Sequence, residues 1–497
     1  MQVTREEGAA TYGLRQWCGW VLGPALLLGT LVFPPPPGLD LTGWRTAGVA
    51  GLMAVLWIAE SMPIPATALL PLVLFPVLGL GDIKATTAPF ANPVIFLFLG
   101  GFIIALAMQR WNLHRRVALA LIGHIGTRPS SIVGGFLLAS ALISMWVSNT
   151  ATALMMLPIA SSVIQLMPRD AENRQARDFG TALLLAVAYG ATTGGMGTLI
   201  GTPPNALLAA FVAEVYNVRI GFGQWMLLGV PVVLCMLPLV HLVLTRVIFR
   251  LDTMAHPETA ALIAAEKSAL GPMSRGEITV CAVFILTALG WILQPLIARS
   301  IPLVSDTGVA LTGALLLFII PVNARKGEFA MTWEDTKGMP WGVLLLFGGG
   351  LSLASAIERH GVAAYLGSLA TGIGGMPLLA VIAIITFGIL MLTELTSNTA
   401  TAATFLPIAG AMAISLGQNP LLFMVPVALA ANCSFMLPVG TPPNAIVFGS
   451  GLITLPQMAR AGMLLNILAV PVVVAMLWLL GPHVFGIEIN LLPHWAR

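Results

Sequence analysis

One pair of polar motifs occurs twice in this chain, within strongly apolar sequence. The hexapeptide SNTATA occupies Ser148–Ala153 and recurs unchanged as Ser397–Ala402. The pentapeptide GTPPN occupies Gly201–Asn205 and recurs as Gly440–Asn444. Two successive prolines interrupt a helix, because proline lacks a backbone N–H and its ring clashes with the preceding turn. The duplication therefore predicts one internally repeated unit with a helix break at the same place in each half.

Composition predicts that these motifs lie within a membrane. Of the 497 residues, 58% are hydrophobic and only 9% are charged, and the mean hydropathy is +0.93. Soluble domains carry about 25% charged residues, so this chain lacks the polar surface that water requires. Apolar stretches of about 20 residues, long enough to cross a bilayer, recur along the chain. We predict an all-α polytopic membrane protein, with no cleavable signal peptide at its start.

Eleven membrane spans and two re-entrant hairpins are predicted. The spans lie near residues 17–36, 43–60, 64–81, 92–109, 179–216, 223–249, 277–297, 306–322, 339–357, 421–449 and 456–481. The hairpins lie near 130–168 and 376–417, each centred on an SNT motif. The fifth and tenth spans contain the GTPPN motifs at their middle. Unwound backbone at that depth is tolerated only where it lines a protein cavity or binds a ligand.

Charge predicts the orientation. With a cytoplasmic N-terminus, 17 of the 23 Lys and Arg residues face the cytoplasm, as cytoplasmic loops prefer. The six that face outside are Arg45, Lys84, Arg219, Arg299, Arg359 and Arg497. The same orientation makes the two repeats inverted. The SNT copies lie 249 residues apart and the GTPPN copies 239. The first half thus holds ten more residues between its motifs (249 − 239), which we place in the polar stretch 169–178.

Each SNT motif belongs to an oxygen-rich cluster suited to a hard cation such as Na⁺. A hydroxyl lies four residues before each SNT serine, at Ser144 and Thr393, and therefore on the same helical face. The other oxygens come from the serine and asparagine of each motif (Ser148, Asn149, Ser397 and Asn398) and from carbonyls freed at the helix breaks. The sequence therefore predicts two equivalent cation clusters, one in each repeat.

An anion can be held between these clusters. Half-helix N-termini present unpaired N–H groups and partial positive charge, and Asn149, Asn398, Thr150 and Thr399 add donors. The motifs contain no Arg or Lys, so bound cations would balance the charge of the anion. The alternative is that Ser, Thr and Asn here only join helices to one another. Helix packing alone would explain a single SNT run. It does not explain why two identical runs are each followed by an identical GTPPN break.

Other polar residues receive structural interpretations. Four scattered cysteines (Cys18, Cys235, Cys281 and Cys433) lack metal-site or disulfide spacing, so we interpret them as packing residues. The glycine run 194–197 lacks the Gly-Lys-[ST] ending of a phosphate loop and is also interpreted as packing. Three acidic residues, Glu60, Glu214 and Glu394, are candidates for proton or ion sites. Because none of them recurs in the other half, we favour a role beside a site or at the membrane interface. His241 is expected to be a hydrogen-bonded packing residue.

The paired SNT motifs and paired GTPPN breaks resemble the divalent anion:sodium symporter family, which includes sodium-coupled dicarboxylate and citrate carriers. The resemblance runs from about residue 40 to the C-terminus. It implies a homodimer, an elevator movement and a di- or tricarboxylate substrate. It implies Na⁺ ligands at Ser144, Ser148, Asn149 and Gly201, and at Thr393, Ser397, Asn398 and Gly440. It implies substrate contacts from Asn149, Thr150, Thr202 and Pro203, and from Asn398, Thr399, Thr441 and Pro442.

The resemblance also implies a division of the chain. Residues 1–128 and 251–375 would be the scaffold helices of the two repeats, and residues 129–250 and 376–497 the two halves of a transport domain. The predicted function is sodium-coupled import of C4-dicarboxylates such as succinate, malate or fumarate across a bacterial inner membrane. No enzymatic reaction, organic cofactor or nucleic-acid partner is expected. The alternatives are a sodium-independent dicarboxylate exchanger and a carrier of an inorganic divalent anion such as sulfate. A membrane sensor is disfavoured, because the longest polar loop, about 250–276, is too short for an output domain.

Overall fold

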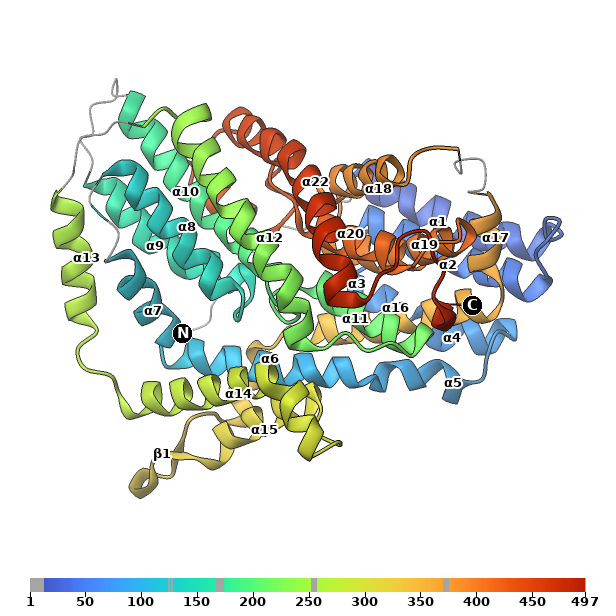
Figure 1. Cartoon of the computed structure of the whole chain (residues 1–497), viewed down its shortest axis with the longest axis horizontal. Helices are drawn as coiled ribbons and strands as arrows, with labels where there is room; N and C mark the ends of the chain where they lie inside the picture. Colours follow the sequence, from blue (N-terminus) through green and yellow to red (C-terminus); the bar gives the residue numbers. More distant parts are fainter. Residues whose placement is uncertain are drawn as a thin grey trace.

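The chain folds into a bundle of α-helices that contains two matching sets of short, interrupted helices (Figure 1). The computed structural model describes residues 13–496 except 124–125, 127, 167–173, 252–256 and 370–374. The helices of the first half are α1 (Leu14–Val32), α2 (Leu41–Ala59), α3 (Ile64–Thr67), α4 (Leu70–Leu78), α5 (Ile83–Thr87), α6 (Pro93–Arg110), α7 (Leu113–Ile122), α8 (Pro129–Ser144), α9 (Asn149–Gln165), α10 (Arg174–Gly195), α11 (Pro203–Tyr216) and α12 (Phe222–Leu242).

The second half repeats this order of elements. Its helices are α13 (Pro257–Ala269), α14 (Arg275–Ser300), α15 (Asp306–Ile319), α16 (Trp341–Arg359), α17 (Val362–Leu369), α18 (Leu378–Thr393), α19 (Asn398–Ser415), α20 (Leu421–Asn432), α21 (Pro442–Phe448) and α22 (Leu455–Phe485). In the described part of the chain, six helical segments are long and apolar enough to cross a membrane. They begin at Leu41, Ile83, Phe222, Arg275, Trp341 and Leu455. The all-α membrane class is therefore confirmed.

Three predicted segments differ from the structure. The predicted span 64–81 is two short helices, α3 and α4, because Pro71 and further prolines interrupt it. The helix predicted over 306–322 ends at Ile319, and the chain continues into a small antiparallel strand pair, β1 (Pro321–Asn323) and β2 (Glu328–Phe329). The predicted loop 250–276 contains helix α13. Part of the polar stretch 169–178 lies outside the described residues.

Both predicted hairpins are helix pairs that turn at the SNT motif. Helices α8 and α9 are joined by residues 145–148, and α18 and α19 by residues 394–397. Both GTPPN segments interrupt a longer element as predicted: α10 stops at Gly195 before α11 starts at Pro203, and α20 stops at Asn432 before α21 starts at Pro442.

The two halves interlock around these interruptions. Helix α21 of the second half packs against α9 and α10 of the first, and α11 of the first half packs against α19 and α20 of the second. Every residue of α20 is buried. Helices α6, α14 and α15 lie together along the lower edge of the view in Figure 1, beside this interlocked region. Packing therefore brings the four motif copies into the same part of the molecule.

Candidate substrate and cation site

Two side chains of the first predicted cation cluster lie in contact. Ser144 Oγ, at the end of α8, donates a hydrogen bond of 2.5 Å to Asn149 Oδ1, at the start of α9. The Asn149 amide also lies against the break between α10 and α11. A methyl group added at Gly195 would be 2.7 Å from Asn149 Oδ1 and 3.1 Å from the Gly201 carbonyl oxygen. Oxygens of Ser144, Asn149 and Gly201 therefore meet around Gly195.

The second cluster repeats this arrangement. Thr393 Oγ1 donates to Asn398 Oδ1 at 2.8 Å and lies 2.9 Å from the Ala431 carbonyl oxygen, near the end of α20. Ser144 and Thr393 are fully buried, whereas Asn149 and Asn398 are half-buried. A hydroxyl hydrogen can rotate away from its acceptor, so hydroxyl and amide oxygens together could face a cation.

Each helix break is fastened by the asparagine of its GTPPN motif. Asn205 Nδ2 donates to the carbonyl oxygens of Gly195, Met196 and Thr198 at 3.2, 3.3 and 2.8 Å. Asn444 Nδ2 donates to Ser434 and Leu437 at 3.2 and 3.0 Å. Unwound backbone buried in a membrane protein must find such partners, because no lipid group can replace them. The asparagines therefore explain how both interruptions persist.

The side chain of Asn432 ties the first break to the second half. Thr202 Oγ1 donates to Asn432 Oδ1 at 2.7 Å, and Asn432 Nδ2 donates to Asn205 Oδ1 at 3.0 Å. The repeat offset of 239 relates Asn432 to Thr193, Thr202 to Thr441 and Asn205 to Asn444. The corresponding atoms of this second trio are Thr193 Oγ1, Thr441 Oγ1 and Asn444 Oδ1, and they are buried without a hydrogen-bond partner. Replacing an amide by the smaller threonine side chain explains the difference.

Sequence reasoning did not select Asn432, although it holds Thr202. Asn432 ends the apolar helix α20 and has threonine as its counterpart, so the repeat gave no signal. A lone amide in an apolar buried helix was the remaining hint, because buried polar groups are normally hydrogen-bonded.

The helix N-termini at the two motif types offer different numbers of donors. Helices α9 and α19 begin at Asn149 and Asn398, and the first N–H groups of a helix have no partner within it. Helices α11 and α21 begin with two prolines, which carry no N–H. The SNT helices therefore present most of the free backbone donors, and the GTPPN helices chiefly contribute the partial charge of their dipoles.

The remaining predicted site residues differ in how far they are exposed to solvent. Thr150, Thr399, Ser397 and Pro203 are half-exposed, and Ser148 and Pro442 are exposed. Ser148 also caps α9, because its Oγ accepts the N–H of Ala151 at 3.3 Å. Thr202 and Thr441 are buried, at 3% exposure each. The SNT side chains can therefore meet an anion from solvent, while the buried threonines lie behind them.

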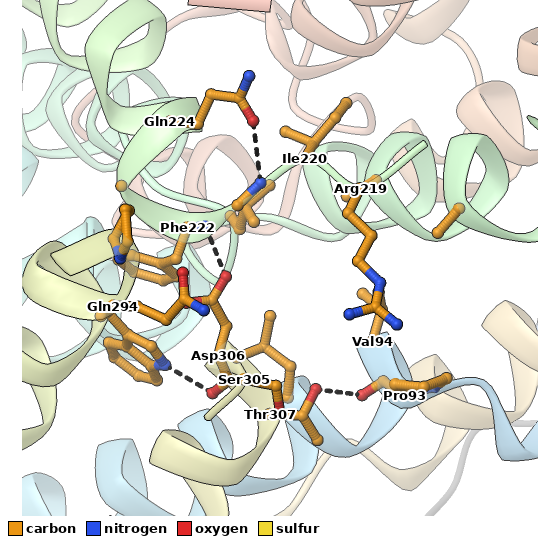
Figure 2. Close-up of a pocket in the computed structure, with 18 of the residues that line it drawn as sticks. Pro93, Val94, Arg219, Ile220, Phe222, Gln224, Gln294, Ser305, Asp306 and Thr307 are labelled. Atoms are coloured by element: carbon orange, nitrogen blue, oxygen red, sulfur yellow. Dashed lines mark hydrogen bonds between the residues drawn. The ribbon is translucent and has the colours of Figure 1, made fainter. Parts of the chain in front are cut away.

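A separate cavity of about 1200 Å³ lies among α6, α11, α12, α14 and α15. Figure 2 shows its polar groups largely bonded to one another: Asp306 accepts the N–H of Phe222 at 2.9 Å, and Thr307 donates to the Pro93 carbonyl oxygen at 2.9 Å. The cavity contains none of the SNT residues, although Leu199 of the first break lines it. Among the described residues the other carboxylate oxygen, Asp306 Oδ1, is buried without a hydrogen-bond partner. We interpret the cavity as a crevice between helices beside the site, because none of the SNT residues lines it.

The glycine run and His241 are confirmed as packing residues, and Cys433 is buried as expected, whereas the packing interpretation of Cys18 is wrong because Cys18 is exposed. In the glycine run, Gly194 lies against the backbone of Ala141 and Gly197 against Met145. His241 Nε2 lies 2.9 Å from the Ser130 carbonyl oxygen. Glu60 pairs with Arg15 at 3.2 Å, with both side chains partly exposed. The four cysteines are free, and the described residues contain no metal-binding group of His, Cys, Asp and Glu side chains.

We predict that Gly195→Ala disrupts the predicted cation cluster while the protein still folds. The new methyl group would push the Asn149 amide away from Ser144 and the Gly201 carbonyl. The measurement is initial uptake rate in proteoliposomes. The matched control is Gly180→Ala on the same helix, where the methyl group meets only the Ile164 side chain at 3.4 Å or more. Equal uptake by the two variants would contradict the proposed cluster.

Apolar spanning helices and two symmetry-related oxygen clusters at interrupted helices define a polytopic membrane transporter. A family model described as the sodium:sulfate symporter transmembrane region matches residues 14–486. The chain therefore belongs to the sodium:sulfate symporter family, which confirms the resemblance seen in the motifs.

Relatives match along nearly the whole chain. The sodium-dependent dicarboxylate transporter SdcS of Staphylococcus saprophyticus is 42% identical over 488 residues, covering 97% of this chain and 94% of the relative. SdcS of Staphylococcus aureus is 41% identical over 483 residues, covering 96% and 93%.

Two solved transporters resemble the chain in fold alone. The YdaH transporter of Alcanivorax borkumensis has a TM-score of 0.56 at 13% identity, covering 95% of this chain and 98% of its own. Neisseria gonorrhoeae MtrF has a TM-score of 0.58 at 11% identity, covering 94% and 96%. Both likenesses support a helical transporter fold.

Proposed function

We propose that this protein is a sodium-coupled symporter that imports C4-dicarboxylates such as succinate, malate or fumarate. The observation that carries the proposal is the hydroxyl–amide pair at each SNT motif, Ser144 with Asn149 and Thr393 with Asn398. In the first half, the Gly201 carbonyl of the helix break completes the group. Hydroxyl, amide and carbonyl oxygens are the donors that hard cations prefer. The relatives' description as sodium-dependent dicarboxylate transporters supports the same choice.

In the proposed site the dicarboxylate lies between the N-termini of α9 and α19. Its carboxylates accept hydrogen bonds from backbone N–H groups and from the Asn149, Thr150, Asn398 and Thr399 side chains. Thr202, Pro203, Thr441 and Pro442 form its remaining contacts. The motifs hold no Arg or Lys, so two Na⁺ ions balance the charge of the substrate. This explains coupling, because the anion binds well only once the ions are in place.

The movement we propose is an elevator. Residues 129–250 and 376–497 would move as the transport domain against the scaffold of residues 1–128 and 251–375. The protein would act as a homodimer in a bacterial inner membrane, with a cytoplasmic N-terminus. The crevice between α11, α12, α14 and α15 lies where these proposed domains meet. A disulfide between cysteines introduced on the two sides of that boundary should stop uptake, because it prevents the movement. Reduction of the disulfide should restore uptake.

The test of the function is uptake of radiolabelled succinate into proteoliposomes under an inward Na⁺ gradient, compared with a matched K⁺ gradient. Empty and succinate-loaded vesicles are run in parallel. Uptake into empty vesicles only with Na⁺ supports symport. Uptake only into loaded vesicles, indifferent to Na⁺, would make the protein an exchanger. Absence of succinate uptake together with Na⁺-driven sulfate uptake would make it an inorganic anion carrier.

The two buried threonines give a prediction of their own. The Thr441 hydroxyl has no protein partner and is free for the substrate, whereas the Thr202 hydroxyl is bonded to Asn432. Thr441→Ala should raise the apparent KM for succinate by about tenfold, the value of one hydrogen bond to a charged group, and change the Na⁺ constant less. Thr202→Ala should chiefly lower thermal stability. Steady-state uptake and melting curves check both, and a larger shift of the Na⁺ constant in Thr441→Ala would contradict the assignment.

A further inference from the structure

Glu394 is a buried carboxylate held entirely by neutral donors. It lies between Thr393 and the second SNT motif and is only 2% exposed. Its carboxylate oxygens accept five hydrogen bonds, from Ser434 Oγ (3.1 Å), the backbone N–H groups of Phe435 (2.7 Å), Met436 (2.9 Å) and Leu437 (3.0 Å), and Asn466 Nδ2 (2.7 Å). Among the described residues no Lys or Arg pairs with it.

Four of these donors belong to the unwound segment between α20 and α21. Three successive backbone N–H groups there point at one carboxylate, which replaces the helical acceptors that the segment lacks. Asn466 fastens the same carboxylate to the long helix α22. Glu394 therefore sets the shape of the second break. Its negative charge stays inside the protein without a countercharge from a basic side chain.

The first half is built without this charge. The repeat offsets relate Glu394 to Met145 and Ser434 to Gly195. At the first break the Thr198 hydroxyl donates to the Met145 carbonyl oxygen at 2.5 Å and accepts the N–H of Gly201 at 3.0 Å. That break is shaped by neutral groups alone. The described surroundings of the two breaks therefore differ by the charge of Glu394.

The charge lies beside the second cation cluster. Glu394 directly follows Thr393 of that cluster in the chain. A methyl group added at Gly440, which the family resemblance assigns to the same cluster, would be 3.2 Å from Glu394 Oε2 and 3.1 Å from the Glu394 carbonyl oxygen. In weakly polar surroundings a carboxylate a few ångströms from a cation contributes strongly to its binding. The first cluster, next to Met145, receives no such contribution.

We propose that Glu394 is a positioning residue that makes the two cation clusters unequal, so that Na⁺ binds first at the Thr393–Asn398 cluster. The proposal rests on the proposed function and adds an order to it. The carboxylate holds the break in the shape that exposes its carbonyl oxygens, and its charge raises Na⁺ affinity there before the anion arrives. The neutral Ser144–Asn149 cluster fills second, together with the dicarboxylate.

The test compares Glu394→Gln with the unaltered protein in two measurements. Binding of ²²Na⁺ to purified protein without dicarboxylate reports the first ion, and the Na⁺ dependence of succinate uptake reports both. Glutamine keeps the size of the side chain and removes the charge. We expect the substrate-free Na⁺ dissociation constant to rise about tenfold or more, and uptake to recover at high Na⁺. A fall in maximal uptake with an unchanged Na⁺ constant would reduce Glu394 to a structural role and overturn the proposal.

Three further variants sharpen the result. Glu394→Asp keeps the charge and should retain more Na⁺ affinity than Glu394→Gln; the reverse order would count against a role for the charge. Glu214→Gln is the control, because Glu214 is a half-buried carboxylate in the last turn of α11, at the opposite end of that helix from the GTPPN motif, and is bonded to Asn92. It should leave Na⁺ binding unchanged.

Ser144→Ala tests the order of binding even if the Glu394 variants fail to fold. It should leave substrate-free ²²Na⁺ binding intact and impair Na⁺-driven uptake. Loss of substrate-free binding in Ser144→Ala would place the first ion at the other cluster and overturn the proposal. Failure of the proposed function itself is seen separately, as sodium-independent succinate uptake by the unaltered protein.

Discussion

Alanine in place of Asn149, or of Asn398, is expected to reduce succinate uptake by about 100-fold or more. Each asparagine is assigned both a cation and a carboxylate contact, and hydrogen bonds to charged groups contribute about 1.5–3 kcal/mol each. Asn149 Oδ1 accepts the Ser144 hydroxyl in the first cluster, and Asn398 Oδ1 accepts the Thr393 hydroxyl in the second. The measurement is initial uptake in proteoliposomes at saturating Na⁺ and succinate.

A control separates this effect from unfolding. Ser162 lies on the same helix as Asn149 and only bonds back to the Pro158 carbonyl oxygen of its own turn. Ser162→Ala should therefore transport normally. Size-exclusion profiles and melting curves of both asparagine variants should match those of the unaltered protein, because both side chains are half-buried. Uptake at the normal rate in either variant would refute the assignment of that asparagine.

Asn205→Ala is expected to be the most destabilising single change at the motifs. The amide donates to three carbonyl groups of the first break and accepts from Asn432. Each buried polar group left unpaired costs about 1–3 kcal/mol. We expect a loss of several kcal/mol, seen as a much lower melting temperature in detergent or as failure to accumulate in the membrane.

Asn444→Ala is the matched comparison, because the chain supplies the same residue in the same motif with fewer bonds. Asn444 Nδ2 donates to two carbonyl groups, and its Oδ1 has no partner. Its replacement should therefore cost less than that of Asn205. Equal melting temperatures for the two variants would show that the bonds across the halves, through Asn432, contribute nothing to stability.

Most of the candidate site was predictable because its residues recur in sequence. Helical spacing predicted that Ser144 and Thr393 share a face with the SNT serines, and this was wrong. Helices α8 and α18 end at Ser144 and Thr393, the chain turns, and the two hydroxyls bond to Asn149 and Asn398 instead. The role of Asn432 could not be predicted, since it reaches Thr202 and Asn205 only after α20 packs against α11. The five donors to Glu394 were equally hidden, because Asn466 is 72 residues away in sequence.

The fold was likewise predictable in part from the sequence. Apolar length and paired prolines predicted the spanning helices and both breaks, because backbone in lipid must satisfy its hydrogen bonds locally. The predicted single span over residues 64–81 was wrong, because prolines divide it into α3 and α4. The strand pair after Ile319 was not predicted.

The sequence by itself determined the membrane class, the internal repeat and the two hydroxyl–amide clusters, since hydropathy and local spacing are properties of short segments. Only the tertiary structure decided how the halves differ. Packing bonds Thr202 to Asn432, leaves the Thr441 hydroxyl without a partner in the described part of the chain, and places the Glu394 charge beside Gly440. The physical reason is that hydrogen bonds and electrostatic interactions depend on distances in space. Two identical motifs have different distances to their neighbours when the residues packed around them differ.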